Sequence, residues 1–270
     1  MTERVVIISD VQYPYHDTRA VKNLIKFIGD YSPDRVYQIG DFLDLPTPSR
    51  WSKGTREEFE QRVVKDSQGF KRDFLEPLRA VYDGPVGFLI GNHDERAMLY
   101  LAKEAPALAE FREVFHPKNL CDFEWFGVDT TPAFHQVGPD TVLIHGHEIK
   151  GSSQIAGTWA YNHAMKANAN VVMGHTHRLG IRRHTSGYIG GKPTVRWGFE
   201  TGNLMDAGKA QYLGAGGVAN WQSGFGILYV GKYDVSPVAI DIRRDGSFVV
   251  EGERYGVLKR GSNGKFAKAS

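Results

Sequence analysis

The segment from Arg4 to Asp17 reads RVVIISDVQYPYHD and begins with an apolar run that stops at Ser9 and Asp10. Four more short runs of apolar, β-branched residues end in the same way, at Gly, Asp, Asn or His. They are RVYQI before Gly40-Asp41, VGFLI before Gly91-Asn92, TVLI before His145 and NVVM before Gly174-His175. Unbroken apolar runs of this length are typical of strands that are buried on both faces. The sequence therefore predicts five buried strands with polar residues at their carboxyl ends.

Three helical patterns accompany the first three runs. They cover residues 18–28, 56–82 and 95–115. We expect Gly69 and Pro77 to break the second helix, because both residues disfavour a helix interior. Strands that alternate with helices predict an α/β architecture with parallel strands.

After Gly180 the composition changes, and helical periodicity gives way to short strands such as residues 225–231 and 236–242. For this half we expect a mainly antiparallel sheet that packs on the first, within one domain covering residues 1–258. The remaining residues, 259–270, read KRGSNGKFAKAS and predict a flexible, mildly basic tail.

Composition places the chain among ordinary globular proteins, with 270 residues, 41% hydrophobic and 24% charged. A net charge of +2 does not indicate a nucleic-acid or membrane surface, although nucleic acid stays a possible partner. No run approaches the roughly 18 apolar residues that a membrane helix needs. The single cysteine, Cys121, excludes an intramolecular disulfide and suits a reducing compartment, so we expect a cytoplasmic protein. The oligomeric state is not indicated.

Side chains that bind metals gather where the predicted strands end. They are Asp10, Asp41, Asp44, Asn92, His93, His145, His147, His175 and His177. Ligands bind outside the carboxyl ends of strands in open α/β sheets, so we expect these groups to lie together. Carboxylate, amide and imidazole donors without a thiolate suit a hard-to-borderline divalent cation and not structural zinc. The set exceeds what one ion needs, and two cations that share a carboxylate fit it better.

Four motifs after Asp10 carry a resemblance to a known family. In chain order they are GDFLD (Gly40 to Asp44), GNHD (Gly91 to Asp94), HGH (His145 to His147) and GHTH (Gly174 to His177). Together they resemble the calcineurin-like metallophosphoesterase family over roughly residues 4 to 180. The later segment NWQSGFGILYV (220–230) is similar to the closing strand of phage-carried members. The resemblance implies a four-layer α/β/β/α sandwich of two packed mixed sheets flanked by helices.

The resemblance also implies a set of ligands for two divalent cations, with Mn²⁺ favoured and Fe, Zn, Ni or Mg as other candidates. Asp41 is expected to bridge them, because a shared anion offsets the repulsion between cations about 3.5–4 Å apart. The first cation is expected to take Asp10, Gln12 and His177, and the second Asn92, His145 and His175.

The same resemblance gives roles to residues outside the metal shell. His93 is expected near the leaving oxygen of the ester, where a protonated imidazole donates its proton to the departing alcohol. Asp44 matches the carboxylate that pairs with His93 and fixes its orientation. His147 has three open roles: a substrate contact, a group behind the ligands, or a solvated residue. Arg178 follows GHTH directly and is a candidate phosphate contact, although an exposed arginine without such a role is the commoner case.

Position 12 departs from the family pattern, which has Asp-x-His where this chain has Asp10-Val11-Gln12. An amide oxygen is a neutral and weaker ligand than imidazole for first-row transition ions. Gln12 binds the first cation directly, or holds a water that binds it, or marks a partly degraded site that leaves one tight metal. We favour direct binding at a weaker site that prefers harder ions such as Mn²⁺. His16 lies too far along the chain, beyond Pro14, to replace the missing histidine.

These expectations lead to a metal-dependent phosphodiesterase that acts on small or nucleotide-derived substrates. The attacking group is expected to be hydroxide that the two cations make available at neutral pH. One alternative is a DNA-repair-type nuclease, which needs a basic groove; only Arg178, Arg182, Arg183 and His184 form a local basic cluster. The other is a non-catalytic, metal-stabilised binding protein in which Gln12 marks lost catalysis. A phosphoprotein phosphatase is less favoured, because no peptide groove is recognisable.

Overall fold

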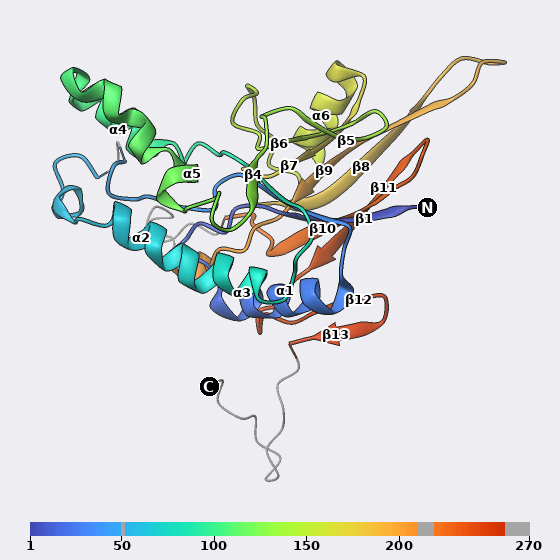
Figure 1. Ribbon diagram of the computed structural model, residues 1–270. Helices are drawn as coiled ribbons and strands as arrows, with labels where there is room; N and C mark the ends of the chain where they lie inside the picture. The colour runs from blue at the N-terminus through green and yellow to red at the C-terminus, as the bar shows by residue number, and fades with distance from the viewer. Residues whose placement is uncertain (50–51, 210–218, 257–270) are drawn as a thin grey trace, which may run out of the picture.

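The five apolar runs form five strands at the centre of two packed sheets, as predicted (Figure 1). The chain is seen in a computed structural model that describes residues 1–49, 52–209 and 219–256. Three runs become β1 (Glu3–Ile8), β2 (Arg35–Ile39) and β3 (Val86–Leu89), which lie in the first sheet. The other two become β6 (Thr141–Ile144) and β7 (Asn170–Met173), which lie in the second.

The first sheet has six strands in the order β11-β10-β1-β2-β3-β4. The strands β1 to β4, the last being Val128–Thr130, are parallel to one another. On the other side of β1, β10 (Gly224–Val230) and β11 (Val235–Asp241) add an antiparallel pair. The sheet is therefore mixed.

The second sheet has five strands in the order β5-β6-β7-β9-β8. Its centre is parallel, formed by β6, β7 and β9 (Thr194–Thr201). Antiparallel strands close both edges, β5 (His135–Gly138) and β8 (Leu179–Ser186). A separate hairpin of β12 (Phe248–Val250) and β13 (Glu253–Tyr255) stands outside both sheets.

Three apolar layers hold the sheets and helices together, and β1 shows why its run is unbroken. Val6 and Ile8 face the helices that cover the first sheet, whereas Val5 and Ile7 face the second sheet. In β7, Val172 faces the first sheet, and its neighbours pack against α6 (Thr158–Ala167). Strands with apolar side chains on both faces need a layer on each side, so the four-layer α/β/β/α class predicted from the family resemblance is confirmed.

Helices cover the first sheet on its outer face, and α6 covers the second (Figure 1). The helices with side chains in the apolar layer on this face are α1 (Thr18–Tyr31), α2 (Val63–Phe70), η2 (Lys71–Leu75), α3 (Glu76–Arg79), α4 (Arg96–Glu104), η3 (Pro106–Phe115) and α5 (Pro117–Leu120). Two short turns, η1 (Arg56–Phe59) and η4 (Ala207–Lys209), contribute no side chain to that layer. Asp17 caps α1 by accepting hydrogen bonds from the backbone N–H groups of Arg19 and Ala20.

The predicted helix breaks at Gly69 and Pro77 are wrong, because one helical run continues from Val63 to Arg79. Its middle turn, η2, is π-helical, and the Glu76 N–H donates a hydrogen bond to the Lys71 carbonyl. Pro77 comes directly after this turn, in the first turn of α3. Gly69 is needed for packing: a Cβ there would lie 2.1 Å from the Tyr13 hydroxyl.

The chain after Gly180 does not form one antiparallel sheet that packs on the first, contrary to expectation, and only the short hairpin of β12 and β13 stays separate. Strands β8 and β9 complete the second sheet, and β10 and β11 complete the first. The predicted domain end at residue 258 and the predicted tail, 259–270, lie outside the described residues. Among the helices of the described ranges, none has the length and apolar character needed to cross a membrane.

Candidate active site

The loops after β1 and β2 are joined by backbone hydrogen bonds that bring their polar residues together. The N–H of Asp10 donates to the Gly40 carbonyl at 3.1 Å, and the N–H of Gln12 donates to the Asp41 carbonyl at 2.9 Å. The strands are parallel neighbours, so both loops leave the sheet at the same edge. Asp10, Gln12 and Asp41 are each buried.

Left-handed backbone marks five of the predicted ligands. The φ angles are +50° at Asp10, +53° at Gln12, +56° at Asp41, +66° at His175 and +58° at His177. This conformation is costly for residues other than glycine and persists only where the surroundings enforce it. At these strand ends, the left-handed conformation turns the side chains away from the strand direction and towards one common centre.

Glycines allow the strand ends to approach one another closely. A Cβ on Gly91 would lie 2.2 Å from Asp41 Oδ1, and one on Gly40 would lie 2.4 Å from His145 Nδ1. A Cβ on Gly174 would lie 2.6 Å from Asp10 Oδ2. The Gly before each polar residue of the motifs therefore creates the space in which the next strand's side chain lies.

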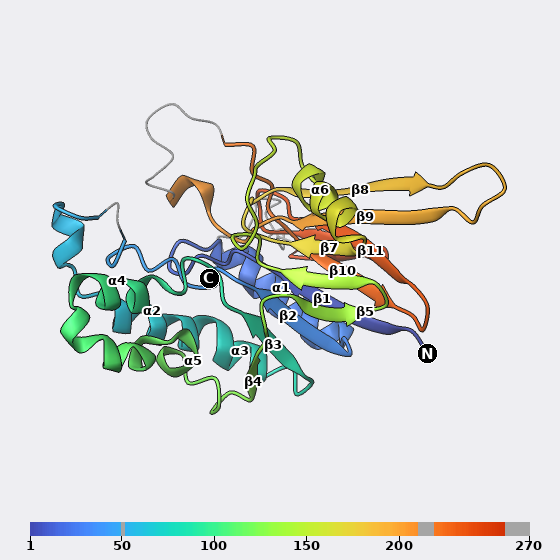
Figure 2. The ribbon, with the colours of Figure 1, turned by 90° about the horizontal axis from the view of Figure 1, so that it is seen from above.

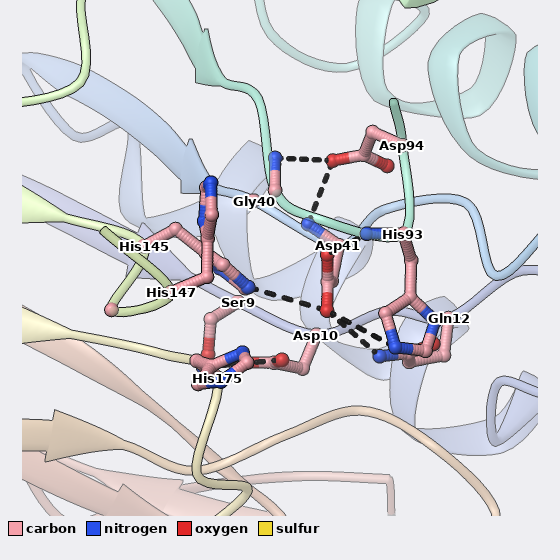
Figure 3. A network of polar contacts seen from close by, with 12 residues as sticks. Ser9, Asp10, Gln12, Gly40, Asp41, His93, Asp94, His145, His147 and His175 are labelled. Carbon is pink, nitrogen blue, oxygen red and sulfur yellow. Dashed lines mark hydrogen bonds and ion pairs between the residues drawn. The ribbon is translucent and has the colours of Figure 1, made fainter. Parts of the chain in front are cut away.

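Asp41 lies at the centre of the cluster (Figure 3). Its Oδ1 accepts a hydrogen bond from the His93 backbone N–H at 2.8 Å. Its Oδ2 accepts from Gln12 Nε2 at 3.2 Å and lies 3.2 Å from His145 Nε2. Asp41, His145 and His175 together can present one ligand atom each within 4.8 Å of one another. Burial alone would raise the pKa of Asp41, but the imidazoles of His145 and His93 hold it well below its usual range.

His145 is held so that Nε2 faces the cluster. Its Nδ1 donates to the Ile39 carbonyl at 2.9 Å, which fixes the ring orientation and leaves Nε2 directed at Asp41. Burial lowers the pKa of His145, but the Asp41 carboxylate outweighs burial and raises it to about 10. The opposite holds for His175, where burial and the charge of His145 lower the pKa to about 4.

A second group of donors lies beside Asp10. Asp10 accepts hydrogen bonds from the backbone N–H of His175, at 2.9 Å to Oδ2, and its Oδ1 lies 3.3 Å from His177 Nε2. The same His177 nitrogen lies 3.4 Å from Gln12 Nε2. Gln12 thus contacts both Asp41 and His177, and the atom that it presents to them is its amide nitrogen.

His93 stands at the edge of the cluster and has partners on both ring nitrogens. Its Nδ1 donates to Asp44 Oδ1 at 2.8 Å, and its Nε2 lies 3.8 Å from Asp41 Oδ2. Arg96 donates to His93 Nε2 at 3.0 Å and to the Asp44 carbonyl at 2.7 Å. The guanidinium can only donate, so His93 Nε2 accepts this bond.

Of the remaining predicted site residues, Asn92 and His147 lie at the cluster, whereas Arg178 has a different partner. Asn92 lies between Gly91 and His93, both of which contact Asp41, and its Oδ1 is buried. The His147 ring lies 5.3 Å from that of His145, so the structure brings it to the cluster. Arg178 instead donates to Gln154 Oε1 at 2.8 Å.

Three supporting residues were missed from the sequence. Asp94 accepts from the backbone N–H groups of Asp41, Leu43 and Gly91 and so fixes the two loops to each other. Glu200 accepts from Trp159 N–H at the start of α6 and from the Thr176 hydroxyl, between His175 and His177. Asp94 belongs to the GNHD motif and could have been singled out; Glu200 and Arg96 had no sequence signal.

The side chains fit a divalent metal centre. Within the described residues, five of the nine buried side-chain polar atoms that lack a hydrogen bond belong to Gln12, Asn92, His145, His147 and His177. Unpartnered buried oxygen and nitrogen atoms cost free energy unless something else binds them. Lone-pair donors of amide and imidazole, beside two carboxylates, are the ligands that such cations prefer.

Comparison with known proteins agrees with this geometry. The family model for calcineurin-like phosphoesterases matches residues 3–207. The chain is 49% identical to the gene 54 proteins of Mycobacterium phages L5 and D29, over 95% of this chain and 100% of theirs. It is also similar to Vacuolar Protein Sorting 29 of Cryptosporidium parvum, with 15% identity, a TM-score of 0.46, and coverage of 94% of this chain and 97% of that one. The chain therefore belongs to the calcineurin-like phosphoesterase family, whose members bind divalent metals and hydrolyse phosphoesters.

Proposed function

We propose that this protein is a metal-dependent phosphodiesterase that hydrolyses small or nucleotide-derived phosphodiesters with two divalent cations, most simply Mn²⁺. The observation that carries the proposal is the convergence of donors from β1, β2, β6 and β7 around the buried carboxylate of Asp41. Family membership supports phosphoester hydrolysis, and the diester preference is our own inference. The single cysteine, Cys121, is a buried free thiol, which supports a reducing, cytoplasmic location.

The ligands divide into two groups that share Asp41. Asp10, Gln12 and His177 would hold the first cation, and Asn92, His145 and His175 the second. When bound, such a pair supplies hydroxide at neutral pH and neutralises the charge on the phosphoryl oxygens. Asp94 keeps the Asp41 and Gly91 loops in place, and the Ile39 carbonyl keeps His145 turned towards the centre.

His93, Asp44 and Arg96 would act on the substrate side. Asp44 holds the Nδ1–H of His93 and so orients Nε2 towards the edge of the metal centre. Arg96 occupies Nε2 here, and an arriving phosphate would compete for the guanidinium, because a doubly hydrogen-bonded anion is its preferred partner. Once Arg96 turns to the phosphate, His93 Nε2 is free to hold a proton for the leaving alcohol.

The function is tested by comparing bis-p-nitrophenyl phosphate with p-nitrophenyl phosphate as substrates. We expect hydrolysis with Mn²⁺, a higher kcat/KM for the diester, loss of activity on chelation and recovery when Mn²⁺ is restored. Activity on neither substrate would favour the metal-stabilised binding protein. A preference for the monoester would contradict the diester specificity but leave the phosphoesterase chemistry intact.

Replacing Gln12 with histidine should tighten the first cation. Gln12 directs Nε2 at Asp41 and His177, and its Oε1 is buried without a partner. Half a turn of the amide places the oxygen where the nitrogen lies, facing the cluster, and imidazole is a stronger ligand at that position. We expect affinity for the weaker Mn²⁺ to rise roughly 10- to 100-fold in Gln12→His, measured by titration calorimetry. Unchanged affinity and turnover would contradict direct binding by Gln12.

Metal affinity should rise with pH, because His145 must lose a proton to bind. Its pKa of about 10 lies above the ordinary 6.5, so the metal-free imidazole is protonated at neutral pH and remains so until pH approaches 10. His175, with a pKa of about 4, is already neutral and releases no proton. We expect the affinity of the second site to rise about tenfold per pH unit near neutrality, with about one proton released. Titration calorimetry in buffers with different heats of ionisation measures the number of protons released on metal binding. An affinity that does not change with pH would exclude His145 as a ligand.

A DNA-repair-type nuclease remains the second candidate function. The observation that favours it is a basic hairpin, β8–β9, which begins at the metal centre.

A further inference from the structure

Strands β8 and β9 form a long hairpin that extends beyond the body of the protein in both views (Figures 1 and 2). The two strands pair along their whole length, from Leu179 opposite Thr201 at the base to Ser186 opposite Thr194 near the tip. The hairpin begins two residues after His177, one of the predicted metal ligands, and every residue from 182 to 190 is exposed. With about 3.3 Å per residue, β8 reaches roughly 25 Å from the site.

The hairpin concentrates positive charge. Residues 178–199 contain five cationic side chains, Arg178, Arg182, Arg183, Lys192 and Arg196, and no Asp or Glu. The one acidic residue of β9, Glu200, lies at the base of the hairpin, where it is buried and accepts hydrogen bonds from Trp159 N–H and the Thr176 hydroxyl. The whole chain has 33 Lys and Arg against 31 Asp and Glu, so the rest of it holds 28 against 31. The small net charge of the whole chain is thus the sum of a positively charged hairpin and a remainder with a net negative charge. Such asymmetry favours an anionic partner at the hairpin.

Most of these cations form no ion pair with the described part of the chain. In the part of the chain that the structure describes, Arg182, Arg183 and Lys192 form no salt bridge. Arg182 donates to the Thr158 hydroxyl at 2.7 Å and lies over the Tyr161 ring, 6.0 Å from its centre, so its partners carry no negative charge. Arg196 differs, because it lies 3.4 Å from Asp140, and its charge is partly neutralised.

A simpler explanation is that charges on an edge strand prevent it from pairing with a strand of another molecule. Strand β8 is an edge strand, and arginines there do discourage pairing with another chain. That role accounts for Arg182 and Arg183 but not for Lys192, which lies beyond the paired residues at the tip. It also argues against a second copy of this chain as the partner, because two such hairpins would repel each other.

We propose that the β8–β9 hairpin is a nucleic-acid-binding arm that holds the phosphate backbone of a polynucleotide and leads it to the metal centre. A two-stranded ribbon is narrow enough for a duplex groove. At the tip, Tyr188 is 81% exposed and offers an aromatic ring beside cations, a combination that binds nucleotides. The inference rests on the phosphodiester hydrolysis proposed above. It replaces the small substrate of that proposal with a polynucleotide, the substrate class of the nuclease alternative.

The test is binding of fluorescein-labelled DNA, duplex and single-stranded, followed by anisotropy across a salt series. Phosphorothioate linkages keep the backbone charge and slow hydrolysis, so the metal-loaded full chain can be used. The arm variant combines Arg182→Gln, Arg183→Gln and Lys192→Gln. Each lost phosphate contact lowers the slope of log K against log salt by about 0.9, so we expect a fall of about 2 to 3 and roughly tenfold or greater loss of affinity at low salt.

A matched control removes three exposed cations from helices of the other layer: Lys22→Gln, Lys65→Gln and Arg112→Gln. It should bind DNA as the unmodified protein does, and all three proteins should hydrolyse bis-p-nitrophenyl phosphate equally. Equal loss of binding in both variants, wild-type binding in the arm variant, or no DNA binding at all would overturn the proposal. Light scattering that showed a dimer dissociated by the arm substitutions would overturn it too. Failure of the proposed function is seen separately, as absent hydrolysis by the unmodified protein.

Discussion

Asp41→Asn is expected to remove both bound cations and nearly all hydrolysis. The substitution keeps the size of the side chain but removes the charge that the two cations would share. Oδ1 would still accept the bond from the His93 N–H, so the new amide nitrogen would face His145 Nε2 and Gln12 Nε2. Breaking a buried charged pair in this way costs about 3–5 kcal/mol. A loss of that size in transition-state binding is roughly a hundredfold to several thousandfold in kcat/KM.

The measurement combines metal content of protein purified without chelator with kcat/KM for bis-p-nitrophenyl phosphate. Asp44→Asn is the matched control, because it makes the same chemical change at a carboxylate that contacts His93 and Arg96 and, among the described residues, none of the predicted metal ligands. We expect the control to keep its metals and lose rate, whereas Asp41→Asn loses both. Two metals per chain in Asp41→Asn, with a rate within tenfold of the unmodified protein, would show that Asp41 does not bridge.

The fold was predictable where side-chain burial alone decides the structure. Val5 to Ile8 needs an apolar layer on each face, and that requirement already implies stacked layers. The sequence did not predict which sheet each strand joins. An apolar run indicates that a strand is buried, but it does not indicate which strands lie beside it. Strands β10 and β11 therefore completed the first sheet against expectation. Gly69 was misjudged for a similar reason, since the Tyr13 ring that requires it comes from a distant part of the chain.

The site was predictable to the extent that its residues lie within short motifs at strand ends. The four motifs and Asp10 place their donors together because parallel strands share an edge. Contacts between distant segments carry no such pattern. Arg96 lies three residues beyond His93 on a helix that looks ordinary, and Glu200 is one acidic residue in a long strand. Their roles depend on which atoms they reach, and only the three-dimensional arrangement shows that.

His93→Ala is expected to lower kcat by about 10²- to 10⁴-fold while metal content stays unchanged, because general acid catalysis contributes a factor of that size. The backbone N–H of His93, which the substitution keeps, donates to Asp41. The ring, which the substitution removes, contacts Asp44 and Arg96 and lies 3.8 Å from Asp41 Oδ2. The loss should depend on the leaving group. An alkyl alcohol needs a proton to depart, whereas p-nitrophenolate leaves readily without one. The rate ratio between unmodified protein and variant should therefore be larger for an alkyl diester than for bis-p-nitrophenyl phosphate.

That dependence separates proton donation from positioning. Arg96→Gln removes a phosphate contact in our proposal, so it should raise KM and affect both substrates to the same degree. His147→Ala removes a histidine near the cluster that has no contact with Asp44 among the described residues, and it should show no dependence on the leaving group. Equal losses for the two diesters in His93→Ala would mean that His93 only orients the substrate. The proton for the alcohol would then have to come from water, and the contact between Asp44 and His93 would serve to hold the ring in place.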